Sequence, residues 1–183
     1  MNELLRQTVH LLMGVIGAGL LLLLDDRWAF ILASAALVAQ FLVCDAITRG
    51  YDVPVVSRAL DETERQERVP LKGGIAYAAG ALLCLAVFGR EYTAVGLVTV
   101  GVLDSVSTLS GLRFGRHFLR GEKSLEGTAA GVAVAALALA FLIPWWAAVV
   151  AAGIAGVVEV CSPVDDNLVV QVGVCMVLAG MGL

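Results

Sequence analysis

The sequence repeats one feature along its length: apolar runs of 16 to 19 residues, separated by short polar segments. A helical run of this length approaches the roughly 20 residues that cross the hydrocarbon core of a bilayer. The chain of 183 residues is 60% hydrophobic and only 15% charged, whereas about a quarter of the residues in soluble domains are charged. The sequence therefore predicts an all-α integral membrane protein, built as a polytopic helix bundle.

We expect seven transmembrane helices in a single integral membrane domain, residues 1–183. Pro144 divides the long apolar tract that begins at Gly127, because proline breaks a helix, and Trp145 and Trp146 suit a membrane interface. The expected spans are Thr8–Leu24, Trp28–Ala46, Gly73–Gly89, Thr93–Ser110, Gly127–Ile143, Trp145–Val160 and Leu168–Leu183.

The lysines and arginines give this bundle an orientation. With seven spans, ten of the 12 basic residues fall on the side of the N-terminus, and only Arg27 and Arg90 fall on the other side. Because basic loops stay in the cytoplasm, we expect a cytoplasmic N-terminus and a C-terminus outside. The loop Val55–Val69 on the cytoplasmic side has charges spaced for a helix, which would either lie along the membrane or simply connect two spans.

Ionisable residues in and beside the spans gather at the same cytoplasmic end. One-sided clustering favours a catalytic face over a transmembrane ion path, which would need polar groups at several depths. The clustered residues are Arg6, His10, Lys72, Asp104, Lys123, Glu126, Glu159, Asp165 and Asp166.

Asp104 lies inside the fourth expected span. An ionisable side chain in a membrane is costly and is therefore a functional candidate, although it could also pair with an arginine or join two helices. Helical spacing puts Asp104 on one face with Gly101, Ser107, Thr108 and Gly111. His10 is a weaker candidate, because a lone histidine at a membrane interface is more often structural.

The loop that follows this span carries four basic residues, Arg113, Arg116, Arg120 and Lys123. Cytoplasmic basic loops often bind only anionic lipid headgroups. Here, however, the loop brings Lys123 and Ser124 to the start of a helix, where free N–H groups and the helix dipole favour phosphate. The motif GxxxxGK[ST] is absent, so a nucleotide site in this chain would differ from a P-loop.

A third polar cluster extends from Glu159 to Asn167, at a turn between two apolar helices. Its three carboxylates and one amide offer the oxygen ligands that Mg²⁺ prefers. The alternative is a polar turn in which Asp165, Asp166 and Asn167 cap the last helix. Capping does not explain Glu159, which is still on the apolar helix.

These blocks resemble the CTP-dependent lipid kinases, a family that includes dolichol kinase, phytol and farnesol kinases, and eukaryotic-type diacylglycerol kinase. The resemblance covers almost the whole chain, and its specific part is the order and spacing of Lys-Ser-Leu-Glu-Gly and Asp-Asn-Leu. Two departures are Gln7, where the family often has lysine, and Leu103, where it often has glycine. The blocks on which the resemblance rests are Arg6 and His10, Leu103–Ser105, Gly111, Phe114–Gly115, Lys123–Thr128, Glu159, Ser162–Pro163 and Asp165–Leu168.

The resemblance implies a kinase that transfers the terminal phosphate of CTP to a lipid alcohol, such as dolichol or polyprenol, at the cytoplasmic face. Its cofactor would be Mg²⁺, and its partners would be the lipid alcohol, the nucleotide and membrane lipids, with no nucleic acid. We expect catalytic roles for Asp104, Lys123, Glu126 and His10; nucleotide binding by Arg113, Arg116, Arg120, Lys123, Ser124 and Gly127; and metal binding by Asp104, Glu126, Glu159, Asp165, Asp166 and Asn167.

Other functions stay open at this point. A CTP-dependent diacylglycerol kinase would use the same residues on another alcohol. A phosphatidate cytidylyltransferase-like enzyme is disfavoured, because the Pro-Gly-His-Gly and Asp-Arg-x-Asp signatures are absent. A small ion-coupled transporter would use Asp104 as its proton or ion site. A structural or assembly subunit would retain its activity without Lys123, Glu126 and Asp166.

Overall fold

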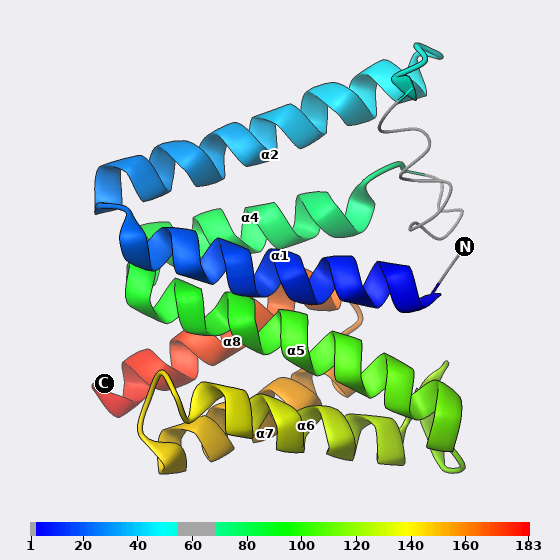
Figure 1. Ribbon diagram of the computed structural model, residues 1–183, viewed down its shortest axis with the longest axis vertical. Coiled ribbons are helices and arrows are strands. Elements are labelled where there is room, and N and C mark those ends of the chain that lie inside the picture. Colours follow the sequence, from blue (N-terminus) through cyan, green and yellow to red (C-terminus); the bar gives the residue numbers. More distant parts are fainter. Residues whose placement is uncertain (1–2, 55–68) are drawn as a thin grey trace.

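The computed structural model describes residues 3–54 and 69–183, which form one bundle of roughly antiparallel helices (Figure 1). Within these ranges the expected all-α class is confirmed, and each expected span corresponds to one helix. The surface helix expected in Val55–Val69 lies outside the described residues, apart from Val69. The helices are α1 (Glu3–Leu23), α2 (Asp26–Thr48), α4 (Lys72–Phe88), α5 (Arg90–Phe114), α6 (Leu125–Leu139), α7 (Trp145–Cys161) and α8 (Asp166–Met181).

The helices differ in how well they match the thickness of a bilayer. Among the described residues, α1, α2 and α5 are long and apolar enough to cross a membrane. The other four helices are also apolar but have only 15 to 17 residues, a rise of roughly 22–26 Å at 1.5 Å per residue. Helix length and composition therefore support three spans directly.

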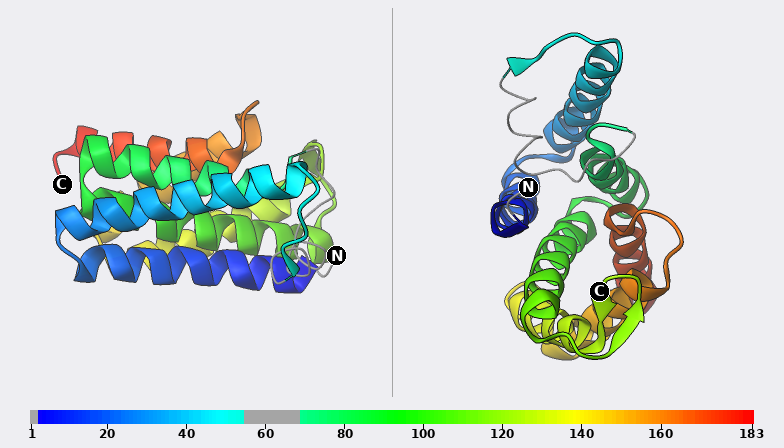
Figure 2. Two further views of the ribbon diagram at one scale, coloured as in Figure 1. Left: turned by 90° about the horizontal axis from the view of Figure 1, so that it is seen from above. Right: turned by 90° about the vertical axis from the view of Figure 1, so that its right-hand side faces the viewer.

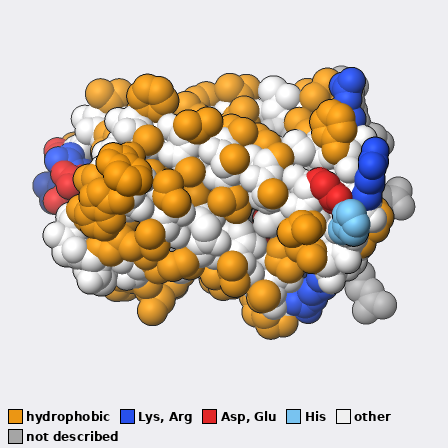
Figure 3. Space-filling model, turned by 90° about the horizontal axis from the view of Figure 1, so that it is seen from below, with side chains coloured by type: hydrophobic (Ala, Val, Ile, Leu, Met, Phe, Trp, Pro, Cys, Tyr) orange, Lys and Arg blue, Asp and Glu red, His pale blue; other side chains and the backbone are white. Residues whose placement is uncertain are grey.

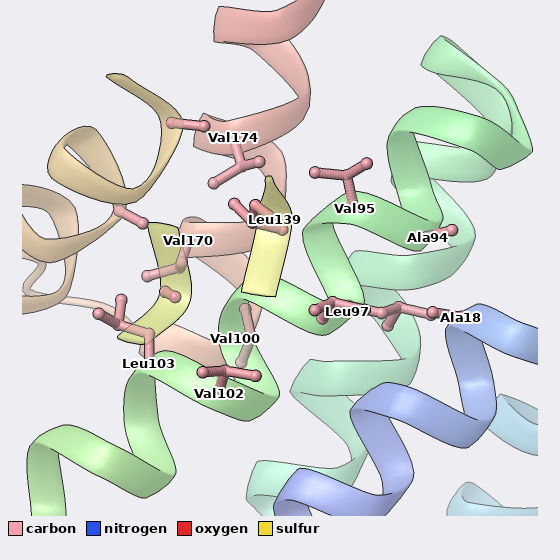
Figure 4. Packing of buried hydrophobic residues seen from close by; sticks show 14 of the residues in the cluster. Ala18, Ala94, Val95, Leu97, Val100, Val102, Leu103, Leu139, Val170 and Val174 are labelled. Carbon is pink, nitrogen blue, oxygen red and sulfur yellow. The ribbon is translucent and has the colours of Figure 1, made fainter. Parts of the chain in front are cut away.

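Helix α5 forms the centre of the bundle. Its residues from Thr93 to Leu103 are all buried, and it packs against α1, α4, α6, α7 and α8 (Figures 2 and 4). Helix α2 lies at the margin, packs mainly on α4, and buries only Ala29. The interior consists largely of alanine, valine and leucine side chains, small groups that let apolar helices approach closely.

Two glycine contacts bring the neighbours of α5 against its backbone. A Cβ atom added at Gly14 of α1 would lie 2.8 Å from the carbonyl oxygen of Leu97 and 3.1 Å from the Cα atom of Gly101. Gly127 of α6 meets α5 in the same way, because an added Cβ atom would lie 2.9 Å from the Cα atom of Gly111. These approaches hold α1 against the middle of α5 and α6 against its C-terminal part.

The outer surface of the bundle is apolar between its two charged ends. On the face seen in Figure 3, hydrophobic side chains are spread along the body of the molecule, while charged side chains gather at the two ends. Large apolar residues point outward at many positions, for example Leu23, Leu137 and Phe141, which are 85%, 68% and 91% exposed. An exposed apolar belt of this extent is unusual for a soluble monomer and marks an interaction surface.

The basic loop between α5 and α6 contains regular structure of its own. It forms a short antiparallel hairpin of β1 (Phe118–Arg120) and β2 (Lys123–Ser124), in which Arg120 pairs with Lys123. Gly121 opens the two-residue connection with a φ of 58°, a backbone conformation that glycine adopts without steric cost. The hairpin folds over the end of the bundle, as the right-hand view in Figure 2 shows.

Candidate functional site

An open cleft of about 1390 Å³ lies at the end of the bundle that carries the hairpin. The N-terminal ends of α1, α4, α6 and α8 and the C-terminal ends of α5 and α7 meet at this end (Figure 1). On the predicted face of α5, Asp104, Ser107, Thr108 and Gly111 line the cleft, whereas Gly101 packs against Gly14 of α1. The one-sided clustering of polar residues inferred from the sequence thus corresponds to a real concavity.

Three carboxylates from three helices meet in this cleft. Asp104 of α5, Glu159 of α7 and Asp166 of α8 each offer one oxygen atom, and these oxygens lie within 4.8 Å of one another. Glu159 is the most deeply buried, with a side chain that is 3% exposed, compared with 18% for Asp104 and 30% for Asp166. We call these three residues the carboxylate trio.

Only one of the two carboxylate oxygens of Glu159 accepts a hydrogen bond. Its Oε1 atom accepts a hydrogen bond of 2.9 Å from the hydroxyl group of Ser107, whereas its buried Oε2 atom has no hydrogen-bond partner among the described residues. The Oδ1 atom of Asn167 is unpartnered in the same sense. Both residues and the rest of the trio line a void of about 10 Å³ behind the cleft. Unpaired buried oxygens are costly, so this arrangement is suited to holding a cation.

Lys123 supplies the positive charge nearest to the trio. Its Nζ atom lies 2.5 Å from Oδ2 of Asp166 and 3.2 Å from Oε1 of Glu159, and it donates to the backbone carbonyl of Glu159 at 3.0 Å. Burial by itself lowers the pKa of Lys123, but the charges of Asp166 and Glu159 outweigh this effect and raise the pKa above its usual value. Lys123 therefore stays protonated at neutral pH.

His10 contacts the trio without lining the cleft. Its Nδ1 atom lies 3.1 Å from Oδ2 of Asp104, and its ring packs edge-on against Tyr77, with the ring centroids 5.4 Å apart. In this arrangement His10 orients Asp104 from within the bundle. Arg6, one turn earlier on α1, does line the cleft and donates to Glu3.

The hairpin is fixed at both ends by polar contacts. At its base, Glu126 accepts hydrogen bonds from the backbone N–H groups of Arg116 and His117, at 3.1 and 3.2 Å, and lies 2.6 Å from the His117 ring. Hydrogen bonding from His117 and from the backbone lowers the pKa of Glu126 to about 2. On the far side, Arg120 donates to the carbonyl groups of Cys161 and Ser162 at the end of α7.

Only some of the expected metal ligands lie together in the structure. It brings Asp104, Glu159 and Asp166 together, with Asn167 beside them. Asp165 lines the cleft, but its side chain caps α8 by accepting from the N–H group of Asn167 at 3.2 Å. Glu126 binds the hairpin base and is not a member of the trio.

Only some of the expected nucleotide-binding residues line the cleft. Arg120, Lys123 and Ser124 line the cleft, although the Ser124 side chain is also the N-cap of α6 and accepts from the N–H group of Gly127. Gly127 itself packs against α5. Arg113 stacks on Phe114 and, like Arg116, does not line the cleft.

Sequence reasoning did not assign site roles to Arg6, Ser107 or Glu3, which all line the cleft. For two of these residues, the spacing in the sequence could have indicated a site role. Ser107 lies three residues after Asp104, on the same helical face, and Arg6 lies four residues before His10. Glu3 had no distinguishing pattern, since a single acidic residue near a helix start is common.

A comparison with known proteins identifies a relative of this chain. The chain is 30% identical over 175 residues to uncharacterized protein MJ1137 of Methanocaldococcus jannaschii, and the match covers 92% of this chain and 88% of that protein. The two proteins belong to one family. No established family profile matches the chain, and no solved structure matches it. The name of the relative states no activity, so the function is argued from the site.

Proposed function

We propose that this protein is an integral membrane kinase, which transfers the terminal phosphate of a nucleotide to a lipid alcohol such as dolichol or polyprenol. The donor is CTP by resemblance to the CTP-dependent lipid kinases. One observation carries the proposal: three carboxylates converge in an open cleft that three cations also line, Lys123, Arg120 and Arg6, together with the acidic residues Glu3, Glu122 and Asp165. Oxygen ligands beside a cluster of cations are what binding of a magnesium–polyphosphate complex requires.

The apolar belt and the charge distribution support a membrane location. We propose that all seven helices cross the bilayer, and that the bilayer is locally thinner around the four shorter ones. The cleft then opens at the cytoplasmic interface, because the end that bears it carries most of the basic residues. A lipid alcohol could present its hydroxyl group there while its chain stays in the hydrocarbon.

The residues of the trio fit Mg²⁺. They offer only oxygen ligands, and the unpartnered Oε2 atom of Glu159 points to a missing electropositive neighbour. Asp104, Glu159 and Asp166 would hold the ion, with Asn167 as a further oxygen donor. When bound, Mg²⁺ would neutralise charge on the nucleotide phosphates.

The other groups of the cleft act on the phosphates and on the acceptor. Lys123, Arg120 and Arg6 bind phosphate oxygens and stabilise the negative charge that builds up on the transferred group. Proximity and orientation account for most of the remaining rate enhancement in phosphoryl transfer. The proton of the acceptor hydroxyl passes to a cleft carboxylate, and Asp104 is best suited because His10 holds its orientation.

The test is a radiolabel transfer assay with purified protein in liposomes, using γ-labelled nucleotides and a panel of lipid alcohols. We expect Mg²⁺-dependent labelling of a polyprenol-type alcohol, with CTP preferred over ATP. Labelling of diacylglycerol instead would mean that the protein transfers phosphate from the nucleotide to a different alcohol. If no alcohol is labelled and the protein conducts ions without nucleotide, the kinase proposal is wrong and the protein is a transporter.

A further inference from the structure

The ammonium group of Lys123 lies where a bound cation would contact the trio. It is within 3.2 Å of carboxylate oxygens from two of the three residues, Glu159 and Asp166, and it also donates to the backbone of Glu159. These contacts connect the hairpin to α7 and α8. In this state the lysine serves as an internal counter-ion for carboxylates that would otherwise repel one another.

A divalent cation and this ammonium group are incompatible in the same position. Mg²⁺ binds carboxylate oxygens at about 2.0–2.1 Å, so it would lie only a few ångströms from the Nζ atom. At that separation the repulsion between the two cations is substantial, because the site is partly buried. Cation binding therefore requires Lys123 to leave the carboxylates.

A displaced Lys123 needs a new anionic partner. Among the other charged side chains that line the cleft, Arg6 and Arg120 repel it, while Glu3 and Asp165 already accept hydrogen bonds from Arg6 and from the N–H group of Asn167. Glu122, in the hairpin turn, offers a single carboxylate. The Lys123 side chain is 30% exposed and is carried by the short hairpin strand β2, so its ammonium group can turn toward the open cleft. A polyphosphate bound to the incoming metal brings several anionic oxygens into this space, whereas Glu122 offers only one carboxylate.

We propose that Lys123 is a resident counter-ion displaced by the ligand, so that the site takes a metal–polyphosphate complex in preference to a free divalent cation. The inference rests on the cation site of the proposed function. It assigns Lys123 two partners in succession: the carboxylates of Glu159 and Asp166 in the empty site, and phosphate oxygens in the loaded one. No chemical step is involved, and the exchange is one of ion pairs only.

The first measurement is binding of free Mn²⁺ to the purified protein, followed by electron paramagnetic resonance. Lys123→Met and Lys123→Gln should each bind Mn²⁺ about tenfold more tightly than the wild type, because a competing charge is gone. Lys123→Arg keeps the charge and should bind like the wild type. Arg49→Met removes a cation that pairs with Asp45 outside the cleft and should change nothing.

The second measurement uses the exchange-inert chromium(III) complex of inorganic triphosphate, which binds as one unit. Lys123→Met and Lys123→Gln should bind this complex about tenfold more weakly, because the phosphate has lost its lysine partner. The same substitution thus shifts the two affinities in opposite directions, which a general loss of structure would not do. Size-exclusion profiles that match the wild type confirm that the variants are folded.

The outcomes separate this inference from the function on which it rests. If the wild type binds Mn²⁺ and Lys123→Met binds it equally or less tightly, the counter-ion role is wrong while the metal site stands. If neither the wild type nor any Lys123 variant binds Mn²⁺, the trio does not bind a cation, and the proposed kinase function is wrong as well.

Discussion

The carboxylates of Asp104 and Asp166 offer oxygens within 4.8 Å of each other, although one residue lies on α5 and the other begins α8. Two carboxylates this close repel, and one takes up a proton unless a cation compensates for the charge. Lys123 supplies part of this compensation at 2.5 Å from Asp166, and the His10 ring lies 3.1 Å from Asp104. Several expected results depend on this juxtaposition.

Asp104→Asn and Asp166→Asn should each reduce phosphate transfer by orders of magnitude and weaken its dependence on Mg²⁺. Because both residues serve one site, the double variant should be little worse than either single one. Turnover measured across a Mg²⁺ titration tests this expectation. Losses that multiply in the double variant would mean that the residues act independently. Asp45→Asn, in an exposed pair with Arg49, is the control and should keep full turnover.

Lys123→Ala should abolish transfer while leaving expression and topology intact, because it removes from the hairpin the charge that we propose binds phosphate. Transfer assays and tag accessibility of the same preparation measure the two properties. Transfer at the wild-type rate would reduce the basic segment to an anchor for lipid headgroups. Arg49→Ala serves as the matched loss of a cation at the same end of the bundle.

The hairpin base should respond to acid at an unusually low pH. The pKa of Glu126 lies at about 2, below the ordinary value of 4.5, mainly because of its hydrogen bond with His117. Its ionised form therefore stabilises the hairpin fully above about pH 4.5, and this contribution is lost as the pH falls through 2. Carboxyl ¹³C shifts should show a midpoint near 2 that moves toward 4.5 in His117→Ala. A wild-type midpoint near 4.5 would contradict the hydrogen bonds.

Gly14 and Gly19 provide a matched pair on α1. Gly14→Ala should destabilise the protein by about 1–3 kcal/mol, because the added Cβ atom meets the backbone of α5, which cannot yield easily. Gly19 faces open space, so Gly19→Ala should be neutral or stabilise the helix by about 0.5–1 kcal/mol. Thermal unfolding in one detergent compares the two. Equal effects would mean that α1 does not pack on α5 through Gly14.

The N-terminus should be cytoplasmic and the C-terminus outside. The described helices run back and forth so that the two ends of the chain lie at opposite ends of the bundle (Figure 1), and most basic residues lie on the N-terminal side. Protease or labelling access to tags at each terminus in sealed vesicles measures this. Tags that are accessible from the same side would mean a wrong number of spans, most simply around Pro144.

The sequence by itself determined the helices and the end of the bundle that is polar. Apolar runs bounded by turn residues, and a break at Pro144, are local signals, and they predicted one helix for each run. Antiparallel helices joined in succession bring alternate connections to the same end, so charges on those connections had to gather. Helical spacing likewise put Asp104 and Ser107 on one face, and both line the cleft.

Only the tertiary structure decided which polar groups meet. Glu126 and Glu159 looked equally suited to a metal, yet Glu159 joins the trio while Glu126 binds His117. The difference arises because the direction of a side chain depends on how its helix is rotated against its neighbours. That rotation is set by contacts far apart in the sequence, such as Gly127 against α5, and the turn at Gly121 then directs Lys123 to Asp166.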